Sequence, residues 1–141
     1  MIYDEVGIHL TEAGSIDRAV VPLGIYLAWC VNHGLISKEL MNLKSPNIVA
    51  VKLREITGSQ LLVAGCGGIL ESRWFNDQGN HFCSLYYPRY IPDFKRVFGA
   101  DIYGIKDDWS SYDLIAPLLT KHLYDRNFGS SRKRWWKLWD R

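Results

Sequence analysis

The sequence predicts a mainly α-helical protein: a single compact domain of six or seven mostly short helices around a buried central helix, with at most a small β element. Three observations predict this fold class. Residues 19–31 are apolar on nearly every face of a helical wheel, helix-capping residues recur along the chain, and 141 residues are enough for one hydrophobic core but not for two.

The central helix is predicted within the stretch from Asp17 to Gly34. A helix that is apolar all round is either buried or spans a membrane. A membrane span needs about 20 apolar residues, whereas the run from Ala19 to Val31 is shorter and contains Pro22. We therefore predict a buried core helix, which ends where Gly34 can adopt the left-handed conformation.

Irregular and short elements are predicted on both sides of this helix. Residues 1–14 have no clear period and predict an irregular arm with room for a short extended piece. After the central helix, Ser37 can cap one short helix, Ser45 and Pro46 open a second, and Thr57 forms a capping box with Gln60 for a third. The apolar residues of these helices are Leu40, Met41 and Leu43, then a stripe of Val49, Leu53 and Ile56, then the run from Leu61 to Cys66.

The aromatic segment in the second half of the chain is open to two interpretations. Asn76 can cap a helix that Pro88 ends, yet residues 81–87 alone also fit a strand. We favour the helix because a cap and a proline bracket it. Pro92 then opens a separate short helix that ends at Gly99.

The last long helix is predicted to begin near Asp108 or Ser110 and to be kinked at Pro117. Its core-facing stripe consists of Tyr112, Ile115, Leu119, His122 and Leu123. With this helix the sequence divides into a single helical domain, residues 1–127, and a C-terminal tail, residues 128–141.

The tail differs from the domain in charge. The whole chain has a net charge of +2, but the last fourteen residues hold five basic residues and one acidic residue, whereas residues 1–127 hold twelve basic and fourteen acidic residues. Basic residues alternate with tryptophans in the tail: Arg132, Lys133, Arg134, Trp135, Trp136 and Trp139. Such a segment can dock on the domain, bind a protein, or contact nucleic acid or a membrane surface.

No constellation in the sequence predicts an enzyme. The cluster Gly65–Gly68 lacks the lysine and hydroxyl of a phosphate-binding loop, and the four histidines show no metal-ligand spacing. Three cysteines in apolar contexts are typical of buried free thiols and of a reducing compartment. There is no signal-peptide pattern. We therefore expect a cytoplasmic, non-enzymatic protein with no cofactor, no metal and no transmembrane segment.

Four separated motifs resemble a family of small bacterial domains of unknown function. They are GIYLAWCVNHGLIS, LREITGSQLL, FNDQGNHFCSLYY and DDWSSYDLIAPLL, preceded by a Tyr3-Asp4 pair and His9. The resemblance covers roughly Tyr3 to Asn127. Two features depart from the family pattern: Pro22 in the central helix, and the basic tail.

Some proteins that resemble this family look like immunity proteins. The resemblance thus implies an immunity protein that binds a cognate secreted antibacterial toxin and neutralises it by covering its active site. The toxin would be encoded by the adjacent gene, in an effector–immunity pair of the kind associated with type VI secretion. Nucleic acid is not expected as the partner, and no residue would be catalytic.

The region before and within the last helix offers candidate contact residues for this partner. Acidic side chains could face a basic toxin cleft and aromatic side chains could anchor it: Asp101, Tyr103, Asp107, Asp108, Trp109 and Asp113. An alternative is that Trp109 and Tyr112 belong to the core and the acids cap the helix. A second functional class, a nucleic-acid or membrane-surface accessory protein, would act through the tail residues named above.

Overall fold

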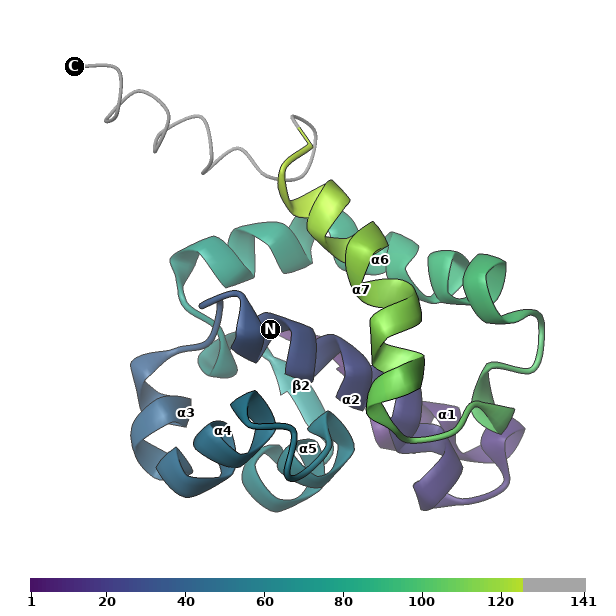
Figure 1. Cartoon of the computed structure of the whole chain (residues 1–141), viewed down its shortest axis with the longest axis horizontal. Helices are drawn as coiled ribbons and strands as arrows, with labels where there is room; N and C mark the ends of the chain where they lie inside the picture. Colours follow the sequence, from purple (N-terminus) through teal and green to yellow (C-terminus); the bar gives the residue numbers. More distant parts are fainter. Residues whose placement is uncertain (126–141) are drawn as a thin grey trace.

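Helix α2 (Ile16–Asn32) occupies the centre of the computed structural model, which describes residues 1–125 (Figure 1). Every residue from 19 to 31 is buried, so the predicted core helix is confirmed. The helix starts before Pro22, at a cap where the Ser15 hydroxyl accepts a hydrogen bond from the Arg18 amide. The carbonyl of Pro22 accepts a hydrogen bond from the buried Tyr90 hydroxyl at 2.6 Å.

The first residues are more regular than the sequence predicts. Strand β1 (Ile2–Glu5) pairs antiparallel with β2 (Ile69–Glu71), with Ile2 opposite Glu71 and Asp4 opposite Leu70. This pair is the predicted small β element. Residues 6–13, predicted as irregular, form α1 (Val6–Ala13). The helix is mostly exposed and has little apolar periodicity, which is why the sequence pattern does not reveal it.

Three short helices follow α2, and the caps predicted for the first and the third are confirmed. They are α3 (Lys38–Leu43), α4 (Ser45–Lys52) and α5 (Gly58–Cys66), and α5 has both hydrogen bonds of the predicted capping box. The second begins at Ser45 with Pro46 in its first turn, but the cap residue is Lys44 and not Ser45. The predicted stripe of α4 is wrong, because Ile48 and Val51 are buried while Val49 and Leu53 are 51% and 63% exposed. Apolar residues occur on both faces of this helix, so periodicity alone does not identify the buried face.

The aromatic segment is helical, but its predicted boundary is wrong. Helix α6 (Asp77–Phe98) continues through both Pro88 and Pro92 instead of stopping at the first. Both prolines are exposed, so water can pair the backbone carbonyls that lose a partner. The opposite side of the helix carries an uninterrupted buried stripe with a spacing of four: Phe82, Tyr86, Tyr90 and Phe94. Burial of this stripe offsets the cost of the two prolines.

Helix α7 (Trp109–Leu123) has the predicted start, since the Asp108 carboxylate accepts a hydrogen bond from the Ser111 amide. Of its predicted stripe, Tyr112, Ile115, Leu119 and Leu123 are buried and His122 is partly exposed. Two 3-10 turns complete the described chain, η1 (Ser72–Trp74) and η2 (Ile102–Gly104).

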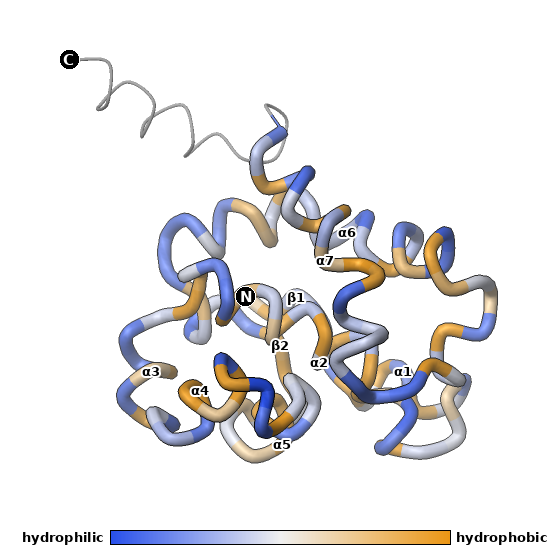
Figure 2. Tube along the Cα trace, viewed as in Figure 1, coloured by the Kyte–Doolittle hydropathy of each residue, from blue (hydrophilic) through white to orange (hydrophobic). Residues whose placement is uncertain are grey.

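All the other long helices pack around α2. In Figure 1, α3, α4 and α5 lie on one side of the molecule, α6 runs along the other, and α7 crosses α6. Figure 2 shows hydrophilic and hydrophobic segments alternating along α6 and α7, as expected for helices with one buried face. Within residues 1–125, no helix combines the length and apolar character needed to cross a membrane.

Helices α2 and α5 approach each other at two glycines. A Cβ atom on Gly58 would lie 1.9 Å from the Gly24 carbonyl oxygen, and one on Gly24 would lie 2.4 Å from the Ser59 amide nitrogen. Because these neighbours are backbone atoms, they cannot move aside as a flexible side chain could. The crossing therefore requires glycine on both helices.

We predict that Gly58→Ala destabilises the protein by about 3 kcal/mol or more, because the added methyl group forces the two helix backbones apart. The matched control is Gly7→Ala in α1, where a Cβ atom meets nothing within 4 Å. This control should be neutral or stabilising by up to about 1 kcal/mol. Urea unfolding of both variants measures the difference, and equal stabilities would refute the tight crossing.

Candidate functional site

A buried carboxylate on β1 organises the most extensive polar cluster among the described residues. Asp4 is 7% exposed, and its oxygens accept hydrogen bonds from the Tyr87 hydroxyl at 2.5 Å and the Glu5 amide at 2.8 Å. His9 Nε2 lies 2.8 and 2.9 Å from the two carboxylate oxygens, and His9 Nδ1 lies 2.5 Å from the Tyr103 hydroxyl. We call these four residues, Asp4, His9, Tyr87 and Tyr103, the Asp4 cluster.

The order of the hydrogen bonds in the Asp4 cluster follows from its chemistry. An ionised carboxylate can only accept, so His9 Nε2 donates to Asp4, and in a neutral imidazole Nδ1 then accepts from Tyr103. Burial raises the pKa of Tyr87 well above its usual value, and Asp4 adds to this effect. Burial also raises the pKa of Tyr103. Both phenols are therefore neutral donors, and the cluster joins β1, α1, α6 and η2.

A second buried carboxylate, Asp93, joins α6 to α7. It is 3% exposed and accepts a hydrogen bond from the Tyr86 hydroxyl at 2.8 Å. His122 Nε2 lies 3.2 Å and Arg96 Nη1 3.4 Å from its oxygens. This arrangement brings a charge-compensated carboxylate to the helix interface, where an unpaired one would be costly.

The histidines do not converge. His33 lies between α2 and α7, where Nδ1 is 2.9 Å from the Trp29 carbonyl oxygen and Nε2 is 3.3 Å from the Thr120 hydroxyl. Thr120 in turn accepts a hydrogen bond from the Trp29 indole at 3.1 Å. Over residues 1–125, no group of three or more His, Cys, Asp or Glu side chains could hold a metal ion.

The structure brings four of the six predicted contact residues together at the start of α7. Asp108 caps the helix, and the Asp107 carboxylate accepts hydrogen bonds from the Ser59 hydroxyl at 3.1 Å and the Thr57 hydroxyl at 3.2 Å. Burial raises the pKa of Asp107. Trp109 is partly buried against Tyr112, with ring centroids 4.7 Å apart, and Asp113 is exposed.

The other two predicted contact residues lie elsewhere. Tyr103 is buried in the Asp4 cluster, where it cannot serve as an exposed anchor. Asp101 is exposed and lies 3.9 Å from the Arg18 guanidinium. The predicted tail contacts, Arg132, Lys133, Arg134, Trp135, Trp136 and Trp139, lie outside the described residues.

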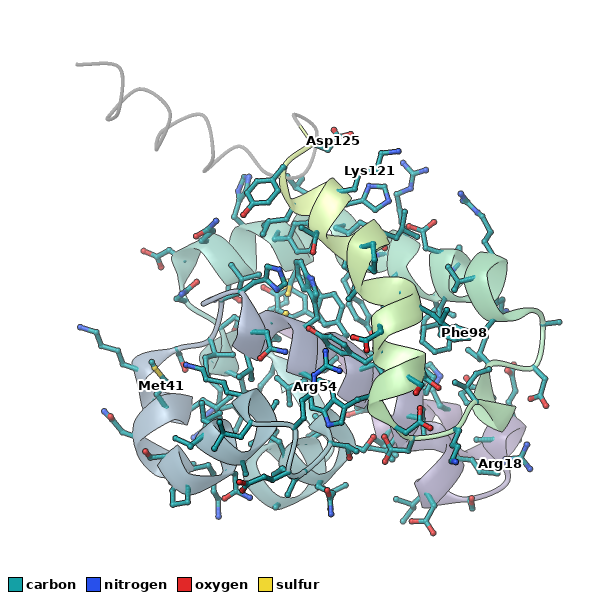
Figure 3. The ribbon with its side chains drawn as sticks, viewed as in Figure 1. Arg18, Met41, Arg54, Phe98, Lys121 and Asp125 are labelled. Atoms are coloured by element: carbon teal, nitrogen blue, oxygen red, sulfur yellow. The ribbon has the colours of Figure 1, made fainter. Side chains whose placement is uncertain are left out.

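Arg54 is the functional candidate that sequence reasoning misses. It lies between α4 and α5, in the middle of the view in Figure 3. Its guanidinium donates two hydrogen bonds to the Asp113 carboxylate, at 2.7 and 3.0 Å, and lies 4.8 Å from the centroid of the Trp109 ring. Fifty-nine residues separate the two charged partners, so no local pattern signals the pair.

The Arg54–Asp113 pair is geometrically well defined but exposed to solvent. The guanidinium holds the pKa of Asp113 below its usual range, chiefly through the hydrogen bonds. The pair therefore stabilises the fold at neutral pH, and this contribution is lost as the pH falls through the lowered pKa of Asp113. Because both side chains are about half exposed, the contribution is small, at about 0–1 kcal/mol.

Exposed aliphatic residues adjoin both partners of this ion pair in the sequence. Leu53 immediately precedes Arg54 and is 63% exposed, and Leu114 immediately follows Asp113 and is 65% exposed. Val49 lies one helical turn before Leu53. We call this surface the Arg54 face: Val49, Leu53, Arg54, Trp109, Asp113 and Leu114.

The backbone of Arg54 is in the left-handed region, with φ of 61°, which is unfavourable for a residue with a Cβ atom. We predict that Arg54→Gly is more stable than Arg54→Ala by about 1 kcal/mol, because both variants lose the ion pair but only glycine removes the strain. Urea unfolding midpoints measure this difference. A more stable alanine variant would contradict the strain.

For the Asp4 cluster we predict that Asp4→Ala lowers the free energy of unfolding by about 3 kcal/mol or more, because it leaves buried donors of three residues without an acceptor. Asp77→Ala is the control, since Asp77 is an exposed acid in the first turn of α6. Asp77→Ala should cost at most about 1 kcal/mol. Thermal and urea unfolding measure the stability of the two variants. Similar losses of unfolding free energy would show that Asp4 contributes no more to stability than an exposed acid.

Comparison with known proteins identifies a family. No curated protein and no solved structure is significantly similar to this chain. A family model described as "Domain of unknown function (DUF7832)" matches residues 2–105. This match includes the complete Asp4 cluster and ends before α7, so it is shorter than the resemblance found in the sequence, and the DDWSSYDLIAPLL motif lies beyond it. Since the match covers most of the chain, the protein belongs to the DUF7832 family of domains of unknown function.

Proposed function

We propose that this protein is an immunity protein that binds a cognate secreted antibacterial toxin through the Arg54 face and neutralises it by covering its active site. The observation that carries the proposal is the composition of this face. A strongly exposed leucine precedes an arginine that lies over a tryptophan ring, and a second exposed leucine follows the aspartate that binds this arginine. Arginine and tryptophan are the residues that most often dominate binding energy in protein interfaces.

The geometry of the Arg54 face favours a protein partner over a small molecule. The pocket next to it, lined by Thr57, Gly58, Trp109 and Tyr112 among others, holds a volume of only ≈ 10 Å³. Exposed aliphatic residues together with an aromatic ring and an arginine provide instead the kinds of side chain that protein interfaces use. The hydrogen bonds between Arg54 and Asp113 fix the arginine in advance, so little side-chain freedom is lost on binding.

The charge of the domain indicates the kind of toxin surface that it fits. Residues 1–127 contain two more acidic than basic residues. Asp107 and Asp108 adjoin Trp109 and add negative charge beside the Arg54 face. A basic cleft, such as one that binds a phosphate-containing substrate, would be complementary to this edge, and the opposite charges would accelerate association.

The biological setting forms part of the same proposal. The protein would act in the cytoplasm on a toxin encoded by the adjacent gene, and it needs no catalytic residue of its own. Blocking requires only a rigid scaffold and a complementary surface, and the packed helices around α2 provide the scaffold.

The proposal predicts that Leu53→Asp and Leu114→Asp each weaken the complex with the product of the adjacent gene by roughly 30-fold or more, as expected for loss of a central contact. The matched control is Leu85→Asp, which alters an exposed leucine on α6 and should leave the affinity unchanged. Co-purification followed by calorimetry measures the three affinities.

Two outcomes would overturn the proposal. If the wild-type protein forms no complex with that gene product, the immunity function is wrong. If a complex forms but all three leucine variants bind equally well, the Arg54 face is not the interface. Co-purification with nucleic acid that salt removes would instead favour the accessory function of the tail.

A further inference from the structure

A groove between α2 and α5 shares only Asp107 with the surface used in the proposed function. It has a volume of ≈ 470 Å³. The residues that line it are Asp17, Val20, Ser59, Gln60, Val63, Ala64 and Asp107, and we call it the α2–α5 groove. Val63 is 53% exposed and Ala64 is also exposed, so the groove presents aliphatic surface to solvent between two carboxylates.

The two carboxylates of the groove are not neutralised within the described part of the chain. Asp107 accepts hydrogen bonds from the Ser59 and Thr57 hydroxyls, but neither Asp107 nor Asp17 has a cationic nitrogen of residues 1–125 within 4.0 Å. The nearest neighbour of Asp107 in sequence, Asp108, is also an acid. The groove therefore combines negative charge with apolar contact area, and it fits a segment in which cations and aromatic rings alternate.

The chain itself contains such a segment. Residues 126–141 hold six basic residues and one acidic residue, together with three tryptophans. Their charge is opposite to that of the groove. Tryptophan rings are suited to aliphatic surface such as Val63 and Ala64, and arginines and lysines to the two carboxylates.

The length of this segment allows it to reach the groove. Helix α7 begins two residues after Asp107, and its 15 residues span about 22 Å. The chain must therefore return about this distance after α7 to reach Asp107. Arg132 follows Asp125 by seven residues, which span up to roughly 23–25 Å when extended. The first basic residues of the tail thus come within reach of the groove, and Trp135 and Trp136 follow directly.

We propose that residues 132–137 of the tail dock in the α2–α5 groove of the same molecule. Because the tail is covalently attached, docking in the groove is intramolecular, so a contact that would be weak between separate molecules is populated more fully. Asp107 lies both in this groove and beside Trp109 of the Arg54 face, so the docked tail borders the surface proposed for the toxin. The inference does not depend on that function, because it concerns only this chain.

The experiment uses the full-length chain with a nitroxide spin label on Ser131→Cys. The three native cysteines are buried, and burial raises the pKa of Cys66 and Cys83 to about 12, so the new thiol is the one that reacts. The label broadens NMR signals of nearby amides. We expect the amide signals of Gln60, Val63 and Ala64 to lose more than about half of their intensity, as follows from the high local concentration of the tail.

Two variants then test the chemistry of the contact. Asp17→Asn/Asp107→Asn should restore the groove signals, because it removes both carboxylates. The control Glu71→Gln/Asp77→Asn changes the net charge equally at acids that do not line the groove, and it should leave the broadening intact. Trp135→Ala/Trp136→Ala, which leaves the described domain unaltered, should also restore the signals. The positions of all other amide signals verify that each variant is folded.

Three results would overturn the inference. Absence of broadening at the groove shows that the tail does not dock there. If both acid variants restore the amide signals equally, the tail is attracted by the overall negative charge of the domain and does not bind a specific site. Broadening of an isotope-labelled, spin-free molecule by a spin-labelled second molecule shows that the tail of another copy occupies the groove. Each result leaves the toxin proposal standing, because none of these measurements involves the toxin.

Discussion

The Asp4 carboxylate is the interaction on which the assembly of the domain most depends. Its chain neighbours form only a short two-stranded sheet, which is marginal on its own. Asp4 connects this strand to α6 through Tyr87, to α1 through His9, and indirectly to η2 through Tyr103. Segments that are up to 94 residues apart are therefore held by one network of hydrogen bonds in which each buried polar group has a partner.

The Asp4 cluster brings together side chains that also occur in proton relays, but it holds them in the interior of the domain. A carboxylate, an imidazole and a phenol that are joined by successive hydrogen bonds are the parts of a proton relay. Here these side chains form hydrogen bonds with one another within the interior, and the pKa of each tyrosine is raised. The polar cluster specifies how the elements fit together, whereas the exposed binding candidates lie on α4, in the segment after it and on α7.

The parts of the fold that depend on local chemistry could be predicted from the sequence, and the parts that depend on distant partners could not. The caps at Ser37, Thr57 and Asp108 are satisfied within one turn, and all three helix starts were predictable. Pro88 failed as a terminator because residues of α2 compensate for it: Tyr26 and Trp29 pack against the aromatic stripe of α6. Arg54 was not predicted because it too depends on a distant partner: its ion pair with Asp113 forms only when α7 packs against the domain.

The three cysteines have a consequence for the environment in which the protein can work. Cys30 and Cys83 lie in the aromatic interior, where the Tyr26 hydroxyl is 3.2 Å from the Cys83 sulfur, and burial raises the pKa of all three thiols. At neutral pH almost none of each thiol is ionised, and thiolate is the species that oxidants and disulfides attack. The folded domain therefore presents no reactive thiolate, so its cysteines stay free thiols in mildly oxidising as well as reducing surroundings.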